Sequence, residues 1–177
     1  MRVLGIDPGS IATGYGVVEK KGSGPLSCVS AGVISAGAKT EFSKRLLKIH
    51  DGINAVIGEF SPDCVSVESL FYSKNARSAA LLGHARGVVL LCAARVGLPV
   101  YEYPPRQVKL AVTGYGGAGK TQVQDMARAI LKTKEKWPLD ASDALAAAIC
   151  HIHLLRPGMG HLLKQPSKLR SWRDVKL

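Results

Sequence analysis

The chain has 177 residues, of which 24 are Lys or Arg and 13 are Asp or Glu, and its formal net charge is +11. This length suits one domain with a core of ordinary size. The apolar runs are interrupted well before the roughly 18 residues that a membrane span needs, and Asp7 comes too early for a secretory signal. We therefore expect a cytoplasmic protein with no membrane segment.

The predicted elements follow one another without a repeat. They are strands over residues 2–7, 13–19 and 27–34, a helix over 42–60, a strand over 64–68, a helix over 75–96, a strand over 99–103, and helices over 106–112, 120–131 and 140–155. The first three strands are expected to form an antiparallel meander. Strands that then alternate with helices predict an α/β fold whose mixed sheet has helices on both faces. Gly83 and Gly87 lie one turn apart and predict a closely packed partner for their helix.

The positive charge is spread along the whole chain. Residues 156–177 hold six Lys or Arg and one Asp, while residues 1–155 still carry 18 basic and 12 acidic side chains. Such a surface is typical of proteins that bind polyanions, although it also keeps many proteins soluble without any ligand. The sequence thus predicts a basic domain over residues 1–155 and a flexible basic tail over residues 156–177.

Four carboxylates stand at the ends of predicted elements. Asp7 ends the first strand and Glu68 ends the fourth, while Asp140 and Asp143 open the last helix on one face, because they are three residues apart. Oxygen ligands of this kind suit Mg²⁺ or Mn²⁺. If the four side chains converge, they can hold two ions, one activating a water and the other stabilising the leaving 3′ oxygen of a phosphodiester.

Each acid also has a structural explanation of its own. Asp7 precedes Pro-Gly and could simply begin a turn. Asp140 and Asp143 match the acidic start that the helix dipole favours. Glu68 is different, because it follows a strand that reads as buried, where an ionised side chain is costly unless it is paired or bound to metal. Since the four acids occur together in a basic chain, we favour a metal site.

A glycine-rich segment suggests a competing function. Residues 114–121, Gly-Tyr-Gly-Gly-Ala-Gly-Lys-Thr, match the phosphate-binding loop G-x-x-x-x-G-K-T of nucleoside triphosphatases. That loop must leave a buried strand, whereas residues 106–112 read as a polar helix, and no apolar strand ending in Asp follows. We therefore expect no ATP hydrolysis. A glycine-rich loop that ends in Lys120 at a helix start can instead bind a DNA phosphate.

Five segments resemble, in order, the motifs of the bacterial Holliday-junction resolvase RuvC family. They are Gly-Ile-Asp-Pro-Gly at 5–9, Val-Glu-Ser-Leu-Phe at 67–71, Gly-His-Ala-Arg-Gly at 83–87, Tyr-Pro-Pro-Arg-Gln-Val-Lys at 103–109 and Asp-Ala-Ser-Asp-Ala-Leu-Ala at 140–146. The resemblance implies a ribonuclease H-like nuclease domain over residues 1–155. Its five-stranded sheet would have three antiparallel strands, then two parallel ones, flanked by helices.

The resemblance also implies an activity. The protein would be a structure-specific endodeoxyribonuclease that resolves four-way DNA junctions by symmetrical nicking during recombination and repair. It would act as a homodimer and work with the junction-binding protein RuvA and the branch-migration motor RuvB. The metal ligands and catalytic residues would be Asp7, Glu68, Asp140 and Asp143, with two Mg²⁺ ions per site that Mn²⁺ can replace.

Further positions transfer from the family as DNA contacts. Phe71 matches an aromatic residue that stacks on a base, although it could also be a core side chain. Lys109 and Lys120 match cations near the scissile phosphate. Lys74 and Arg77 are further candidates for phosphate contacts. His151 and His153, near the end of the last helix, are expected to be packing residues.

Two other functions fit the same residues. A nuclease of the same fold could act on structured RNA, since the acids would serve both substrates. A non-catalytic junction-binding module would tolerate the loss of an acid, and the presence of all four counts against it. Sugar kinases and actin-like proteins also begin with a strand, Asp and Gly, but that fold needs two such domains and a longer chain.

Overall fold

The computed structural model describes residues 1–69 and 75–155. Each predicted element is found there, with bounds within one residue of those expected. The elements are β1 (Arg2–Asp7), β2 (Ala12–Lys20), β3 (Leu26–Ser35), α1 (Phe42–Phe60), β4 (Cys64–Glu68), α2 (Ala76–Arg95), β5 (Val100–Tyr103), α3 (Pro105–Thr113), α4 (Lys120–Ile130) and α5 (Leu139–Leu154). No helix within these described residues is long and apolar enough to cross a membrane.

The strands form one mixed sheet in the order β3-β2-β1-β4-β5. β1 pairs antiparallel with β2, and β2 antiparallel with β3, whereas β1–β4 and β4–β5 are parallel pairs. The expected ribonuclease H-like arrangement is therefore confirmed. Ile6 lies beside Val67 in the parallel pair, so the residues that end these strands, Asp7 and Glu68, reach the same edge of the sheet.

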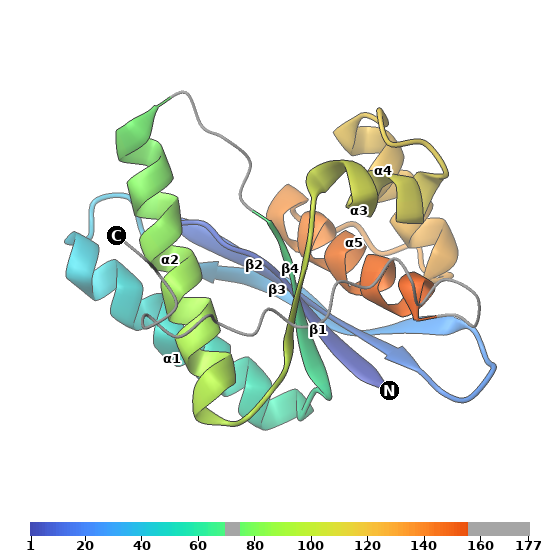
Figure 1. Ribbon diagram of the computed structural model, residues 1–177, viewed down its shortest axis with the longest axis horizontal. Coiled ribbons are helices and arrows are strands. Elements are labelled where there is room, and N and C mark those ends of the chain that lie inside the picture. The colour runs from blue at the N-terminus through green and yellow to red at the C-terminus, as the bar shows by residue number, and fades with distance from the viewer. Residues whose placement is uncertain (70–74, 156–177) are drawn as a thin grey trace, which may run out of the picture.

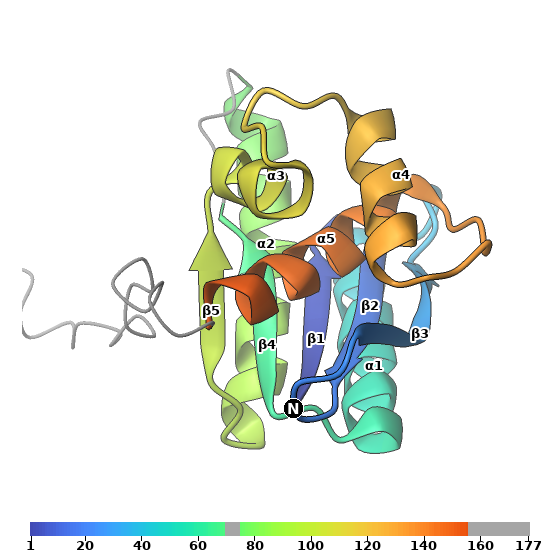
Figure 2. The ribbon, with the colours of Figure 1, turned by 90° about the vertical axis from the view of Figure 1, so that its right-hand side faces the viewer.

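Helices cover both faces of the sheet. α1 and α2 lie on one face, and α5 crosses the other with α3 and α4 beside it (Figure 1). The alternation of side chains along β1 serves both layers, because Val3 packs into the core under α5 while Leu4 packs into the core under α1 and α2. α3 and α4 stand at the end of the sheet where β1 and β4 finish (Figure 2).

Glycines let α5 lie directly on the sheet. A side-chain carbon at Gly5 would be 1.9 Å from the carbonyl oxygen of Ala144, and one at Gly14 would be 2.0 Å from that of Asp140. Neither position can hold a larger residue unless backbone atoms move, because real carbon atoms do not approach this closely. This contact was not foreseen from the sequence. It fixes the first turn of α5 against β2 at Gly14 and the following turn against β1 at Gly5.

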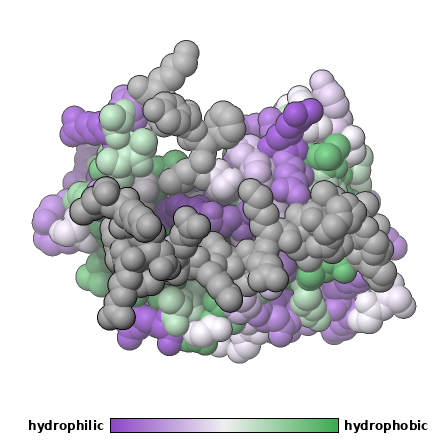
Figure 3. Space-filling view, in the orientation of Figure 1, coloured by the Kyte–Doolittle hydropathy of each residue, from purple (hydrophilic) through white to green (hydrophobic). Residues whose placement is uncertain are grey.

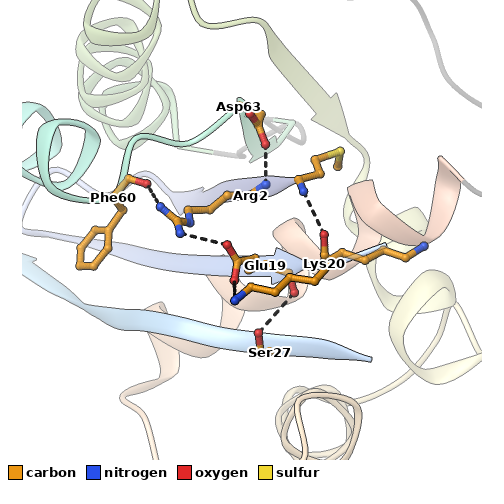
Figure 4. A network of polar contacts seen from close by, with 8 residues as sticks. Arg2, Glu19, Lys20, Ser27, Phe60 and Asp63 are labelled. Carbon is orange, nitrogen blue, oxygen red and sulfur yellow. Dashed lines mark hydrogen bonds and ion pairs between the residues drawn. The ribbon is translucent and has the colours of Figure 1, made fainter. Parts of the chain in front are cut away.

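A polar network around Arg2 lies at the other end of the sheet, where β1 begins (Figure 4). Its guanidinium pairs with Glu19 at 2.9 Å and also donates to the carbonyl oxygen of Phe60. The backbone N–H of Arg2 donates to Asp63 at 2.6 Å. These contacts join β1, β2 and the end of α1. They lie at the start of β1, whereas Asp7 lies at its end.

Candidate active site

A pocket of about 260 Å³ opens at the edge where β1 and β4 end. Side chains from five elements line it, including three acids and two lysines. The lining residues are Asp7, Glu68, Pro105, Val108, Lys109, Lys120, Val123, Asp143 and Ala146. Segments far apart in the sequence thus bring together three of the four predicted acids and the two lysines expected beside them.

The acids of this pocket repel one another. Burial, followed by the negative charges of Asp143, Glu68 and Asp140, raises the pKa of Asp7 to about 7. Burial and then the charge of Asp143 also raise the pKa of Glu68, while Lys120 and Lys109 lower it. Asp140 does not line the pocket, but its charge acts on Asp7. The two lysines offset this repulsion only in part, which favours the binding of a further cation.

Lys120 is held against one of the acids. Its ammonium nitrogen lies 3.2 Å from Asp143 Oδ2, and that charge is the main reason why the pKa of Lys120 is raised. The lysine opens α4, whose start is fixed by a hydrogen bond of 2.9 Å from the Gly119 N–H to the side-chain oxygen of Gln122. The glycine-rich loop therefore delivers a cation to the acidic pocket.

The triphosphatase interpretation does not fit the loop's surroundings. The loop follows a helix, α3, which ends at Gly114 in the left-handed conformation with φ 77°. A nucleotide-binding loop needs a buried strand at this point. In this chain α3 separates the loop from β5, the strand that precedes it in the sequence. This is the order expected from the sequence.

The donor set suits a hard divalent cation with few protein ligands. The pocket offers the carboxylate oxygens of Asp7, Glu68 and Asp143, and Mg²⁺ and Mn²⁺ prefer oxygen ligands of this kind. Within residues 1–69 and 75–155, no three His, Cys, Asp or Glu side chains stand close enough together to enclose a metal ion. Mg²⁺ commonly keeps several waters and binds through one or two carboxylates, so an open arrangement fits it.

Among the other predicted DNA contacts, Arg77 does not line the pocket. Arg77 is exposed in the first turn of α2. Phe71 and Lys74 fall outside the described residues, as does the tail 156–177. His151 is fully buried and its Nδ1 is 2.6 Å from the hydroxyl oxygen of Tyr103, so its predicted packing role is confirmed.

Arg86 belongs to the family motif at residues 83–87, but no role was predicted for it. Its side chain is 11% exposed, and it contacts the backbone oxygen of Glu68. A guanidinium within a helix otherwise rich in Ala, Leu and Val was the available signal.

The surface seen from the side of Figure 1 mixes hydrophobic and hydrophilic residues, and hydrophilic ones are prominent over α3 and α4 (Figure 3).

The fold and the pocket define a class of enzyme. A ribonuclease H-like sheet that gathers carboxylates at the ends of β1 and β4 and at the start of α5 is the framework of a divalent-metal-dependent nuclease. The family follows from the sequence, because the family model described as "Crossover junction endodeoxyribonuclease RuvC" matches residues 3–151. The chain belongs to this family.

Individual relatives agree with this assignment. The crossover junction endodeoxyribonuclease RuvC of Pelobacter propionicus is 49% identical over 179 residues, which cover 99% of each chain. That of Geobacter sulfurreducens is 51% identical over 151 residues, which cover 85% of this chain and 92% of the relative. Among solved structures, Thermus thermophilus RuvC in complex with a Holliday junction substrate matches with a TM-score of 0.84 and 38% identity, over 90% of this chain and 97% of that one.

A more distant structure shows the same fold. The yeast mitochondrial Holliday junction resolvase Ydc2 matches with a TM-score of 0.63, although only 11% of the aligned residues are identical. The match covers 85% of this chain and 77% of that one. At this level of identity the likeness concerns the arrangement of the strands and helices alone.

Proposed function

We propose that the chain resolves four-way DNA junctions by nicking two strands symmetrically, in reactions that depend on divalent metal ions and serve recombination and repair. One observation carries the proposal. The pocket gathers three carboxylates from three separate elements, with a fourth beside them, and places two lysines at their rim. An acidic centre with a basic rim suits a metal-dependent reaction on a phosphodiester.

The metal ligands in this proposal are Asp7, Glu68, Asp140 and Asp143, holding two Mg²⁺ ions for which Mn²⁺ can substitute. When bound, the ions would make a water more acidic and neutralise charge on the leaving oxygen. The protein's own contribution is to bring the acids to one end of the sheet, where bound ions would draw their side chains together. Lys120, which faces Asp143, adds a fixed positive charge where a phosphate would enter.

We assign the DNA contacts to residues around this pocket. Lys109 and Lys120 line it, and both would contact the phosphate next to the cut. Arg77 would contact the backbone farther away. The proposed base stacking by Phe71 and the phosphate contact of Lys74 rest on the resemblance of the sequence to the family. So does the division into a nuclease domain, 1–155, and a basic tail, 156–177.

We further propose that the protein acts as a homodimer through the outer face of α2. A groove of about 550 Å³ runs along this face and is lined by Ala80, Gly83, His84, Gly87, Val88 and Leu91. A side-chain carbon at Gly83 or Gly87 would meet no atom within 4 Å, so the close packing partner predicted for them does not come from the described part of the chain. A second copy would satisfy this face and supply the two-fold symmetry that paired nicks require.

The remaining elements of the proposal follow from the family. We propose that the protein works in the cytoplasm, alongside RuvA and RuvB, because a junction resolvase acts on DNA. A non-catalytic junction-binding module has less support, because it would gain nothing from a set of mutually repelling acids. A structured RNA substrate remains the competing candidate, and the test below separates it from DNA.

The test uses four-way junctions of identical sequence, made from DNA or from RNA, and a linear DNA duplex as control. With Mg²⁺ present, we expect paired nicks at equivalent positions on opposite strands of the DNA junction and little cutting of the duplex. Mapping both labelled strands on a sequencing gel gives the positions. Preferred cutting of the RNA junction, or equal cutting of the linear duplex, would contradict the proposed function.

A further inference from the structure

We infer that Arg86 is a positioning residue that holds the end of β4, and with it Glu68, in the orientation that the metal site needs. The inference rests on the proposed role of Glu68 as a metal ligand. It adds a residue that touches neither metal nor substrate and acts through the backbone of the acid.

Arg86 reaches from α2 to the ends of two strands. Its Nη1 donates a hydrogen bond of 3.1 Å to the backbone oxygen of Glu68. Its Nη2 forms an ion pair with the Glu102 carboxylate on β5. α2, which carries Arg86, lies on the face of the sheet opposite α5 (Figure 2).

The chemistry of these contacts calls for an arginine. The side chain is 11% exposed, and its helix neighbours Ala85 and Val89 are buried, so an unpaired charge would be costly there. The planar guanidinium presents several N–H donors in a fixed fork and can satisfy a carbonyl and a carboxylate together. A lysine could pair with Glu102 but has no such fork for both partners.

Glu68 depends on this contact because it ends its strand. The pairing of β4 with β1 stops at Val67 and Ile6. On the other side, the N–H of Ser69 donates to the carbonyl oxygen of Tyr103 at 2.8 Å. The bond from Arg86 fixes the peptide group between Glu68 and Ser69 from a third direction, and rotation of that group would turn the Glu68 side chain away from Asp7 and Asp143.

The test compares four variants in otherwise unchanged full-length protein. Arg86→Gln removes both contacts, Arg86→Lys keeps the charge, and Glu102→Gln removes only the ion pair. Arg95→Gln is the matched control, because it removes one positive charge from the same helix at an exposed position. Mn²⁺ binding to the free protein is measured by electron paramagnetic resonance, and the Mg²⁺ concentration for half-maximal nicking is measured separately.

For Arg86→Gln we expect two quantities to rise by about 10-fold or more: the dissociation constant for Mn²⁺ and the Mg²⁺ concentration for half-maximal nicking. Effects of this size are seen when groups that orient metal ligands are removed. In Arg86→Lys both quantities should rise less than in Arg86→Gln, because the positive charge is kept. They should also rise less in Glu102→Gln, and in Arg95→Gln they should equal the wild-type values. Junction affinity without metal should stay the same in all four. A general loss of folding would lower that affinity too, and thermal unfolding of each variant checks for it.

Wild-type metal dependence in folded Arg86→Gln would overturn the inference. If Arg86→Gln does not fold, Arg86→Lys and Glu102→Gln carry the test, and wild-type metal dependence in both would also overturn it. Glu68→Gln separates this failure from failure of the proposed function. If Glu68→Gln binds Mn²⁺ and nicks junctions normally, the ligand assignment itself is wrong, whereas a defective Glu68→Gln beside an unaffected Arg86→Gln removes only the role of Arg86.

Discussion

The ammonium of Lys120 lies 3.2 Å from Asp143 Oδ2, and the two residues come from different helices, α4 and α5. The lysine side chain is 70% exposed and the aspartate 25%, so the lysine covers the acid from the solvent side. The pair joins the glycine-rich loop to the acidic pocket. In the proposed reaction, an ammonium in this position would face the phosphate of the bound DNA.

Replacement of Lys120 by Ala should slow nicking by about 100-fold, since one fixed group that stabilises transition-state charge is commonly worth that much. Junction binding should weaken modestly, and its dependence on the logarithm of salt concentration should fall by about one unit of slope. Lys48→Ala, an exposed lysine on α1, is the control. Equal nicking rates for Lys120→Ala and the control would remove Lys120 from the site.

The close approach of α5 to the sheet gives a prediction about stability. Gly5→Ala should lower the free energy of unfolding by about 2 kcal/mol or more, because the new methyl group collides with the backbone at Ala144. Gly58→Ala, at an exposed position of α1 with open space around it, should instead raise it by about 0.5–1 kcal/mol. Urea denaturation of both variants measures the difference. A fully stable Gly5→Ala protein would show that α5 does not pack this closely.

The buried histidine on α5 predicts a loss of stability in acid. Burial lowers the pKa of His151 from its usual value of 6.5 to about 4, so the unfolded chain binds a proton between these pH values while the folded protein does not. Stability from this group is complete above pH 6.5 and falls as the pH drops towards 4, by up to about 1.4 kcal/mol per pH unit.

The comparison for this effect is His151→Gln. The acids of the pocket titrate in both proteins, so the difference in unfolding free energy between them isolates the histidine. We expect that difference to shrink as the pH is lowered from 7 to 4.5. Parallel curves for the two proteins over this range would mean that His151 titrates equally in the folded and unfolded chains.

The groove on α2 predicts how the dimer can be broken. Gly87→Leu should place a bulky side chain in the proposed interface and shift the protein towards monomer at micromolar concentration, leaving single nicks in place of paired ones. Gly58→Leu puts the same side chain on exposed α1 and should leave the association unchanged. Analytical ultracentrifugation reports the outcome. A wild-type monomer that still cuts junctions in pairs would refute the dimer.

Much of the fold could be predicted from the sequence, because its elements have simple signals. The strand over residues 64–68 is a short apolar run after a proline, and the helix over 42–60 has regular apolar spacing. Asp7 and Glu68 stood at strand ends, where parallel pairing brings neighbouring carboxyl ends to one edge. The family motifs supplied the rest of the topology.

The tertiary contacts could not be predicted in the same way. Glycine within a strand usually weakens it, and only the structure shows that α5 rests on the sheet at Gly5 and Gly14. The pairing of Arg86 with Glu68 and Glu102 joins three elements, and no local pattern marks it. Asp140 was expected to share the pocket equally, but it acts on Asp7 through its charge without lining the pocket.

The most direct test of the metal-dependent site is the nicking of a synthetic four-way DNA junction by Asp7→Asn in Mg²⁺ or Mn²⁺, with binding to the same junction measured in parallel. The substitution removes one negative charge from the centre of the acidic pocket and leaves the basic surface intact. We predict that junction binding stays at the wild-type level and that nicking is abolished. Nicking by Asp7→Asn at the wild-type rate would contradict the assignment of this pocket as the active site.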